Sequence, residues 1–334
     1  MRVLYVAAKY DYGDQSRGLS FEHHNFYDTL IHMGFDILYF DYITEYQQRG
    51  KSAMNTYLLD IVKTEKPNLL FCVLFKNELD IATMRYISNN TDTTTFNWFC
   101  DDHWRFDNYS RHWAPAFNWV STTAVSALPK YQQIGYKNVI KTQWACNHYS
   151  YKPSGQYPEY DVTFVGQPHG NRCQIIDALR ASGIRVETWG HGWPLGRLSQ
   201  EDMITVFSNS RINLNLSNAS IQGRRKWQLW HRKPAVSQIK GRNFEVPGCG
   251  GFMLTDLAEN LEDYYTPGQE IAIFPHKEEL VSQVKYYLDQ ESVRRQIAEN
   301  GYRRTLAEHT YEKRFEELFQ IMGLTAPTRL VGFK

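Results

Sequence analysis

The chain has 334 residues, of which 42% are hydrophobic and 22% are charged, an ordinary balance for a globular protein. This length is long for one hydrophobic core and sufficient for two domains of about 100–200 residues each. The formal net charge of +1 excludes a bulk attraction to nucleic acid or to a membrane surface, so any such role requires a local patch of charge.

The five cysteines are scattered along the chain, and no two are spaced as a CxxC pair. This pattern argues against a disulfide framework or a zinc knuckle and is typical of a reducing cytoplasm. The longest apolar run, LLFCVLF at residues 69–75, is far shorter than the roughly 18 residues of a membrane-spanning helix. The N-terminal stretch MRVLYVAAKY reads as a strand and not as a signal peptide. We therefore expect a soluble, cytoplasmic protein without a transmembrane segment.

The first 150 residues alternate short apolar runs with helical patterns, which favours a parallel α/β domain. Strands are predicted at residues 2–8, 35–42, 68–75, 94–100, 117–123 and 138–145, and helices at 20–34, 54–66 and 124–135. The strands are apolar throughout, so helices are expected to cover both faces of their sheet. Residues 1–150 are therefore predicted to form one doubly wound domain.

A polar, turn-rich stretch at residues 147–160 reads as a linker to a second domain. Further strands are predicted at 161–166, 184–190, 211–217, 251–256 and 270–274, and helices at 171–183, 200–210, 277–290 and 291–309. Residues 151–310 are thus predicted to form a second doubly wound domain. A last helix beginning near Thr310 has apolar side chains at helical spacing, so the segment 311–334 is expected to pack back on the first domain.

Chemistry is concentrated in the stretch KGRNFEVPGCGGFMLTD, residues 240–256. Its glycines and prolines predict a bend and a short helix before an apolar strand, and a helix N-terminus favours a bound phosphate. Lys240 and Arg242, with Asn243 beside them, could neutralise a diphosphate, and Glu245 could accept hydrogen bonds from ribose or sugar hydroxyls. Together these groups indicate a nucleotide-sugar site. The plain alternative is a surface Lys/Arg pair and a solvated glutamate beside a glycine turn.

Two more candidates follow predicted strands of the second half. In doubly wound domains the carboxyl ends of the strands face the ligand cleft. Gly166, in FVGQPHGNR, would allow close approach of a phosphate or a base, and Asn215, in NLNLSN, would donate or accept a hydrogen bond. A turn that needs glycine and a capping asparagine are the structural alternatives.

In the first half the best catalytic candidates are Asp101, Asp102 and His103, which follow a buried strand in WFCDDHWRF. Glycosyl transfer requires that an acceptor hydroxyl lose its proton, and a carboxylate or an imidazole can take it. Adjacent carboxylates point to different sides, so at most one is the base. An Asx turn with a packed histidine is the alternative. His23 and His24 diverge on a helix and have no third ligand in view, so no metal site is predicted.

The second half resembles the donor-binding half of group 1 glycosyltransferases, in particular the CgeB-like (spore maturation protein) branch. The matching stretches are YDVTFVGQPHGNR, RINLNLS, IKGRNFEVPGCGGFMLTD, YYTPGQEIAIF and ENGYRRTLAEHTYEKRF; FNWFCDDHWRF, FNWVSTT and YQQIGYKNVIKTQWACN resemble the branch more loosely. The resemblance implies a GT-B fold, in which two Rossmann-like domains face an active site between them. It also implies sugar transfer from an activated, usually nucleotide-linked donor without an essential metal.

The resemblance assigns roles to single residues as well. Glu245 matches the second glutamate of the family's ExxxxxxxE motif, which contacts the donor ribose, whereas Ser237 stands in place of the first. This departure leaves the retaining or inverting outcome open. The basic stretch GRRKWQLWHRK, with Arg224 and Arg225, corresponds to a loop near the donor phosphates. Its cations and tryptophans could instead bind an anionic acceptor or a single-stranded nucleic acid, or form a solvated surface.

We therefore predict a cytoplasmic, metal-independent glycosyltransferase that needs no cofactor and uses a UDP-, GDP- or dTDP-linked sugar as its donor substrate. The acceptor, which could be a glycan, a protein, a small molecule or a nucleic acid, is left open. The alternative is a GT-B-like module that binds a nucleotide or a sugar without transferring it, and Ser237 is its main support.

Overall fold

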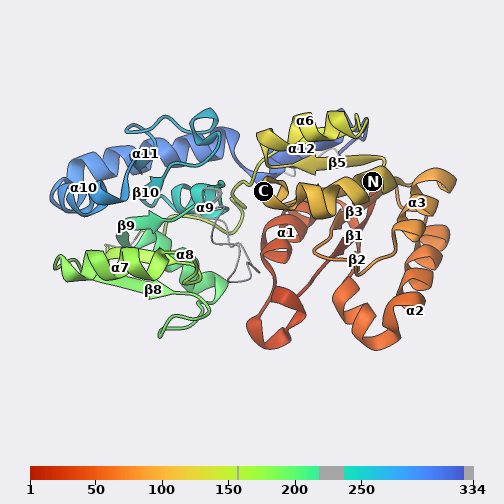
Figure 1. Ribbon diagram of the computed structural model, residues 1–334, viewed down its shortest axis with the longest axis horizontal. Helices are drawn as coiled ribbons and strands as arrows, with labels where there is room; N and C mark the ends of the chain where they lie inside the picture. Colours follow the sequence, from red (N-terminus) through yellow and green to blue (C-terminus); the bar gives the residue numbers. More distant parts are fainter. Residues whose placement is uncertain (156–157, 218–236, 327–334) are drawn as a thin grey trace, which may run out of the picture. The chain divides into compact units, whose positions relative to one another are not determined.

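The computed structural model describes residues 1–155, 158–217 and 237–326, which fall into two compact units (Figure 1). Unit 1 comprises Met1–Gln143 and Tyr311–Lys334, and unit 2 comprises Trp144–Thr310. The boundary, expected at residue 150, lies earlier because the backbone N–H of Cys146 donates to the carbonyl oxygen of His309 at 2.9 Å. This hydrogen bond ties the first residues of unit 2 to its last ones.

Unit 1 contains a parallel six-stranded sheet in the order β2-β1-β3-β4-β5-β6. Its strands are β1 Arg2–Ala7, β2 Asp36–Phe40, β3 Leu69–Val73, β4 Thr94–Phe99, β5 Trp119–Thr122 and β6 Val139–Lys141. Its helices are α1 Asp28–His32, α2 Tyr42–Glu65, α3 Ile81–Asn90, α4 Asp102–Arg105, α5 Arg111–Trp113, α6 Leu128–Gln133 and α12 Tyr311–Ile321. Every side chain of β3 is buried, as the apolar run predicts for a central parallel strand.

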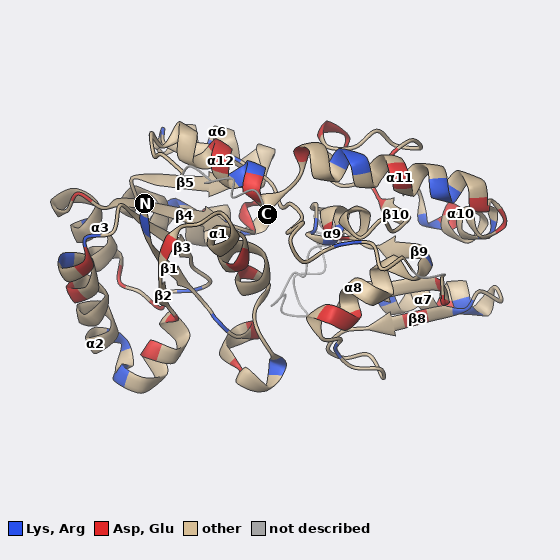
Figure 2. Cartoon of the chain, turned by 180° about the vertical axis from the view of Figure 1, so that it is seen from behind, with Lys and Arg blue, Asp and Glu red and all other residues tan. Residues whose placement is uncertain are grey.

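Unit 2 contains a parallel five-stranded sheet in the order β11-β10-β9-β7-β8. Its strands are β7 Tyr160–Val165, β8 Val186–Trp189, β9 Ser210–Asn215, β10 Met253–Asp256 and β11 Ala272–Phe274. Its helices are α7 Arg172–Ala181, α8 Gln200–Ser208, α9 Arg242–Gly248, α10 Lys277–Asp289 and α11 Glu291–Glu308. Charged residues lie mainly on the helices and loops of both units (Figure 2). The prediction of two parallel α/β domains is confirmed.

Several helices of unit 1 differ from the sequence prediction, and α3, α4 and α5 were not predicted. The helix expected at 54–66 begins earlier, at Tyr42, where the Asp41 side chain accepts a hydrogen bond from the backbone of Ile43 at 3.3 Å. Its first half is polar and is interrupted at Gly50, so no apolar periodicity marked it. The helix expected at 20–34 is split into a π-helical turn, His23–Tyr27, and α1.

Helix α12 belongs to unit 1 although it comes from the far end of the chain. Its apolar face meets aromatic residues of the first half: the ring of Phe315 lies 5.7 Å from those of Phe26 and Phe71 and 6.4 Å from that of Trp98. Phe315 is fully buried. The apolar stripe that the sequence places on this helix is therefore part of the core of unit 1.

The substitution Phe315→Ala should lower the free energy of unfolding by about 3–5 kcal/mol, because it leaves a cavity among these rings. Ile321→Ala, at a side chain of the same helix that is 45% exposed, is the control and should change it by about 0.5 kcal/mol or less. Urea unfolding followed by circular dichroism measures both. Equal effects of the two substitutions would show that α12 does not stabilise unit 1 through this face.

Candidate functional site

Two arginines of unit 2 lie over one aromatic ring at the carboxyl ends of β7 and β9. Arg172 opens α7 after the loop that follows β7, and Arg242 opens α9. Their guanidinium carbons lie 5.4 and 5.6 Å, respectively, from the ring centroid of Phe164. Two like charges are thus held together beside one ring, with Lys240 nearby. We call Arg172, Lys240 and Arg242 the cation cradle.

The Arg242 side chain is held at one end only. Its Nε donates to Oδ1 of Asn215 at 3.0 Å. Its Nη2 is buried and has no hydrogen-bond acceptor among residues 1–155, 158–217 and 237–326. A Cβ at Gly166 would lie 3.0 Å from Nη1 of Arg242, so glycine at this position leaves room for the guanidinium. Gly166 therefore shapes the cradle, whereas its predicted contact with a phosphate or a base stays a prediction.

Neutral groups hold Arg172 in place. Its Nη1 donates to the carbonyl oxygen of Gln167 at 2.9 Å and lies 2.8 Å from Nε2 of His169, and its Nη2 donates to the carbonyl oxygen of Leu216 at 2.8 Å. The pKa of His169 is lowered to about 4 by burial and by the three cradle cations. His169 is therefore neutral at pH 7 and can accept a hydrogen bond from Arg172 without adding charge.

The electrostatics of the cradle favour an anion. Burial, followed by the charge of Arg242, lowers the pKa of Arg172 to about 9. Burial also lowers the pKa of Arg242, although Glu245 and Asp256 act in the opposite direction. A buried cation gains much from a hydrogen-bonded anion, and a guanidinium offers phosphate oxygens two parallel donors.

Asn215 and Asn243 position the cradle. Both are almost fully buried. Asn215 donates through Nδ2 to Oδ1 of Asn243 at 3.1 Å and to Oγ1 of Thr255 at 3.0 Å. Asn243 also accepts from the backbone N–H of Lys240 at 2.9 Å. These side chains link the loop before α9 to β9 and β10, so they orient the cations, whereas direct contact with a ligand stays a prediction.

Glu245 lies on the buried side of α9. It is 3% exposed, and its Oε1 accepts a hydrogen bond from the hydroxyl of Tyr151 at 2.9 Å. A Cβ at Gly248 would lie 2.3 Å from Sγ of Cys146, so this glycine permits close packing inside unit 2 rather than approach to a ligand. The role of Glu245 as a hydroxyl clamp stays a prediction. Arg224 and Arg225 lie outside the described residues.

The three catalytic candidates of unit 1 differ in their surroundings. Asp102 is 2% exposed, and its carboxylate accepts hydrogen bonds from Ser110 and, at 2.7 Å, from the hydroxyl of Tyr131. This enclosure favours a structural role for Asp102. Asp101 precedes α4, where its backbone carbonyl accepts from the N–H groups of Trp104 and Arg105, and its side chain and that of His103 are partly exposed. Their catalytic role stays a prediction.

A fourth candidate, Glu22, was missed because the sequence places it inside a predicted helix. It follows the loop after β1, and the hydroxyl of Tyr5 donates to its backbone carbonyl at 3.1 Å. Burial raises its pKa from 4.5 to about 7, and the negative charges of Asp11 and Asp101 act in the same direction. A carboxyl group that titrates near pH 7 at the carboxyl edge of a parallel sheet suits proton transfer.

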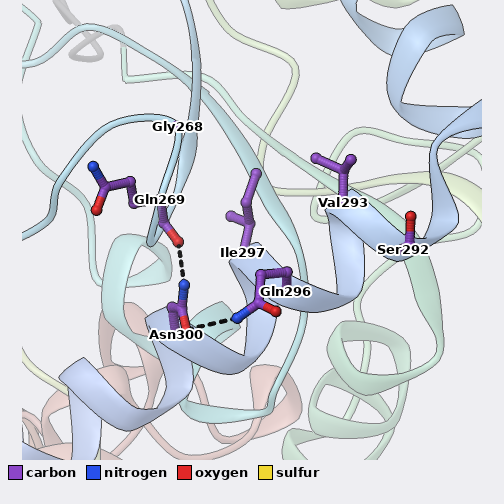
Figure 3. Close-up of a pocket in the computed structure, with 7 residues that line it drawn as sticks. All are labelled: Gly268, Gln269, Ser292, Val293, Gln296, Ile297 and Asn300. Atoms are coloured by element: carbon purple, nitrogen blue, oxygen red, sulfur yellow. Dashed lines mark hydrogen bonds between the residues drawn. The ribbon is translucent and has the colours of Figure 1, made fainter.

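A shallow groove elsewhere in unit 2 contains none of these residues (Figure 3). It lies between the loop at Gly268 and α11, where Asn300 donates to the carbonyl oxygen of Gln269 at 3.0 Å and accepts from Gln296 at 3.1 Å. Its lining carries no charge. Within the described residues, no cluster of three or more metal-ligating side chains occurs, and none of the helices has the length and apolar character needed to cross a bilayer.

Residues 172–320 match the model of the glycosyl transferase-like family. Spore protein CgeB of Bacillus subtilis (strain 168) is 22% identical over 209 residues, which are 58% of this chain and 64% of that protein. The chain therefore aligns with slightly less than two thirds of the length of this relative. The family-model match, residues 172–320, includes Arg172 and the stretch 240–256, so it covers the cation cradle.

Solved structures of glycosyltransferases share the whole fold. Sucrose-phosphate synthase from Thermosynechococcus elongatus has a TM-score of 0.68 and 9% identity, with 96% of this chain and 98% of that chain covered. HepE from Anabaena, in complex with UDP-glucose, has a TM-score of 0.67 and 11% identity, with 97% and 99% covered. The chain thus has the GT-B fold that the sequence predicts, and it is similar to the glycosyl transferase-like family and to CgeB over the regions matched.

Because the pKa of Glu22 is raised, we expect the free energy of unfolding to depend on pH. Folding raises this pKa, so the folded protein binds the proton more tightly than the unfolded chain does, and stability falls as the pH rises from 4.5 to about 7. Glu22→Gln removes this titration. The variant should therefore gain stability relative to the wild type as the pH rises through this window, by at most about 3 kcal/mol above pH 7.

Urea unfolding at pH 4.5, 6 and 8 measures this difference. Asp60→Asn, which removes a negative charge from the exposed side of α2, is the control. If the two variants show the same change in stability between pH 4.5 and pH 8, Glu22 is not the group responsible.

Proposed function

We propose that the protein transfers a sugar from a nucleoside diphosphate sugar to an acceptor hydroxyl, and that unit 2 binds the donor without a metal ion. One observation carries this proposal: the Arg242 guanidinium is buried beside Arg172, and its Nη2 has no acceptor within the described residues. A diphosphate would supply oxygen acceptors and negative charge together. The match of residues 172–320 to the glycosyl transferase-like family supports a nucleotide sugar as the source of that diphosphate.

The cation cradle explains how a metal would be dispensable. The leaving diphosphate develops negative charge as the glycosidic bond breaks, and fixed cations stabilise that charge as a divalent ion does in other enzymes. Arg242 and Arg172 are already oriented by Asn215 and by backbone carbonyls, so little reorganisation is needed. UDP-glucose is the first donor to test because HepE was solved with it, while GDP- and dTDP-sugars remain candidates.

We assign acceptor activation to unit 1, with Glu22 as the general base. Asp101 contributes its negative charge, which helps to keep the pKa of Glu22 near 7. In the deprotonated form, Glu22 would take the proton of the acceptor hydroxyl as the new glycosidic bond forms. His103 and Asp101 are the alternative bases in the same loop region.

A binding module without transfer activity is the second candidate, because Ser237 replaces a glutamate of the family motif. Product analysis separates the two functions. Transfer, or slow hydrolysis of the donor, releases UDP from UDP-glucose, whereas a binding module retains the intact nucleotide sugar.

Arg242→Ala should weaken UDP binding by about 10- to 100-fold, since charged hydrogen bonds contribute about 1.5–3 kcal/mol. Arg242→Lys should recover only part of this affinity, because an ammonium group lacks the guanidinium fork. Isothermal titration with UDP and UDP-glucose in the presence of EDTA measures the loss and tests metal independence at once.

Uridine and Arg295→Ala are the matched controls. Uridine has no phosphate, so its affinity should not respond to Arg242→Ala. Arg295, whose side chain on α11 is 67% exposed, should leave UDP binding unchanged. Unchanged UDP affinity in Arg242→Ala, or an equal loss for uridine, would contradict a diphosphate site at Arg242.

The assignment of Glu22 predicts the pH profile of transfer. With the pKa of Glu22 at about 7, kcat/KM should rise with pH to a plateau above pH 8, because only the carboxylate can accept the proton. Glu22→Gln should lower kcat by about 100-fold or more and abolish the rise of kcat/KM with pH. The affinity for UDP should stay the same. If kcat/KM of the Glu22→Gln variant still rises with pH in this range, Glu22 is not the general base, and Asp101 or His103 takes its place in the proposal.

A further inference from the structure

The loop after β1 holds an aromatic side chain outward on a strained backbone. Tyr12 has φ 52° and ψ 22°, in the left-handed region that side chains other than glycine and asparagine rarely adopt. Its side chain is nevertheless 56% exposed, so burial does not explain why tyrosine occupies this position. Strain of this kind persists where the surrounding structure fixes it, and it occurs often at binding sites.

This loop is rigidly built. The backbone of Tyr10 pairs with Leu19 in an antiparallel bridge, and the N–H of Asp11 donates to the carbonyl oxygen of Gly18 at 3.0 Å. Gly13 packs against α2 so closely that a Cβ would lie 2.3 Å from Cγ2 of Ile43. The position of Tyr12 is therefore set by its neighbours.

A second exposed ring lies beside Tyr12. Phe75, which follows β3, is 40% exposed, and its ring centroid is 5.8 Å from that of Tyr12 at an interplanar angle of 83°. Arg105, which ends α4 after β4, donates to the carbonyl oxygen of Phe75 at 2.6 Å. Loops from three adjacent strands, β1, β3 and β4, thus build one surface. We call Tyr12 and Phe75 the aromatic rim.

Charged groups of both signs surround the rim. Arg17 lies 4.7 Å from the ring centroid of Tyr12 and pairs with Asp11 at 3.1 Å, and Arg105 and Lys76 lie 5.5 and 5.4 Å from that of Phe75. Four carboxyl groups lie near the rim on these loops, those of Asp11, Glu22, Glu78 and Asp101. Three cations thus lie among four carboxyl groups, so the surface offers donors and acceptors without an excess of positive charge.

We infer that the aromatic rim binds a neutral sugar ring of the acceptor, which makes the acceptor a carbohydrate; this inference rests on the proposed function. The apolar C–H face of the ring packs on Tyr12 and Phe75, as flat apolar surfaces do. Its hydroxyls, which donate and accept, pair with Arg17, Arg105 and the neighbouring carboxylates. A nucleic acid would require an excess of cations, which this surface does not have.

The test uses the full chain loaded with UDP and a panel of neutral mono-, di- and trisaccharides that includes maltose, cellobiose, lactose and chitobiose. Saturation-transfer NMR should detect binding of at least one sugar, and titration should give its affinity. Tyr12→Ala and Phe75→Ala should each weaken it by about 10-fold or more. Tyr12→Phe, which keeps the ring, should stay within about twofold of the wild type, as should Tyr86→Ala at a tyrosine of α3 that is 45% exposed.

Three results would overturn the inference. The first is that no sugar of the panel binds, and the second is that Tyr12→Ala binds the sugar as tightly as the wild type does. The third is that oligonucleotides bind more tightly than the sugars, with an affinity that falls steeply as salt is added. UDP affinity, measured on the same samples, keeps the two proposals apart: if UDP binds and the sugars do not, only the acceptor assignment fails. Thermal unfolding of each variant excludes loss of the fold, and Tyr12→Gly, which relieves the backbone strain while removing the ring, must lose sugar binding as well.

Discussion

The constraint on which the candidate site depends is the pair of guanidinium groups over Phe164. Several exposed arginines of this protein pair directly with carboxylates, as Arg303 does with Glu299 at 2.7 Å. Arg172 and Arg242 are instead held by a histidine that is neutral at pH 7, an asparagine and backbone carbonyls. Such partners fix the geometry of the cations. Burial lowers the pKa of both arginines although Asp256 acts on both in the opposite direction, so a bound anion would stabilise their charged forms.

This constraint accounts for the neighbouring side chains. Asn215 touches Arg242 through one atom and both Asn243 and Thr255 through another, so the end of β9, the start of α9 and the end of β10 must keep one arrangement. Gly166 provides the space into which the guanidinium extends. The polar residues at the carboxyl edge of this sheet are thus used to hold charge in a fixed position, which is how a preorganised phosphate site lowers its cost of binding.

The sequence predicts the fold well because local pattern decides it. Continuous apolar runs indicate parallel strands, and the stripe of Tyr311, Phe315 and Phe319 indicates a packed last helix. It predicts Lys240 and Arg242 because they lie in one recognisable stretch. It does not indicate Arg172, Glu22 or Tyr12 as site residues. Their neighbours come from loops that are distant in sequence and meet only because their strands are adjacent in the sheet. Asn215 and Asn243 were expected to contact a ligand. The sequence does not indicate that Asn215 bonds to both Asn243 and Arg242.

The carboxyl groups of unit 1 show why a residue type at a strand end is not enough to assign chemistry. Asp102 and Glu22 both have pKa values raised mainly by burial. Around Asp102, however, Ser110 and Tyr131 donate hydrogen bonds to the carboxylate, and such donors stabilise the charged form and bind it into the core. Around Glu22, burial outweighs the hydrogen bonds from its own backbone and from Ser20, and the charges of Asp11 and Asp101 act with burial to favour the proton. The two groups differ in the donors that they meet, since Asp102 accepts hydrogen bonds from the side chains of Ser110 and Tyr131 inside the core. These surroundings are the reason for proposing Glu22, on the β1 loop that also carries Tyr12, as the base in place of the buried aspartate after β4.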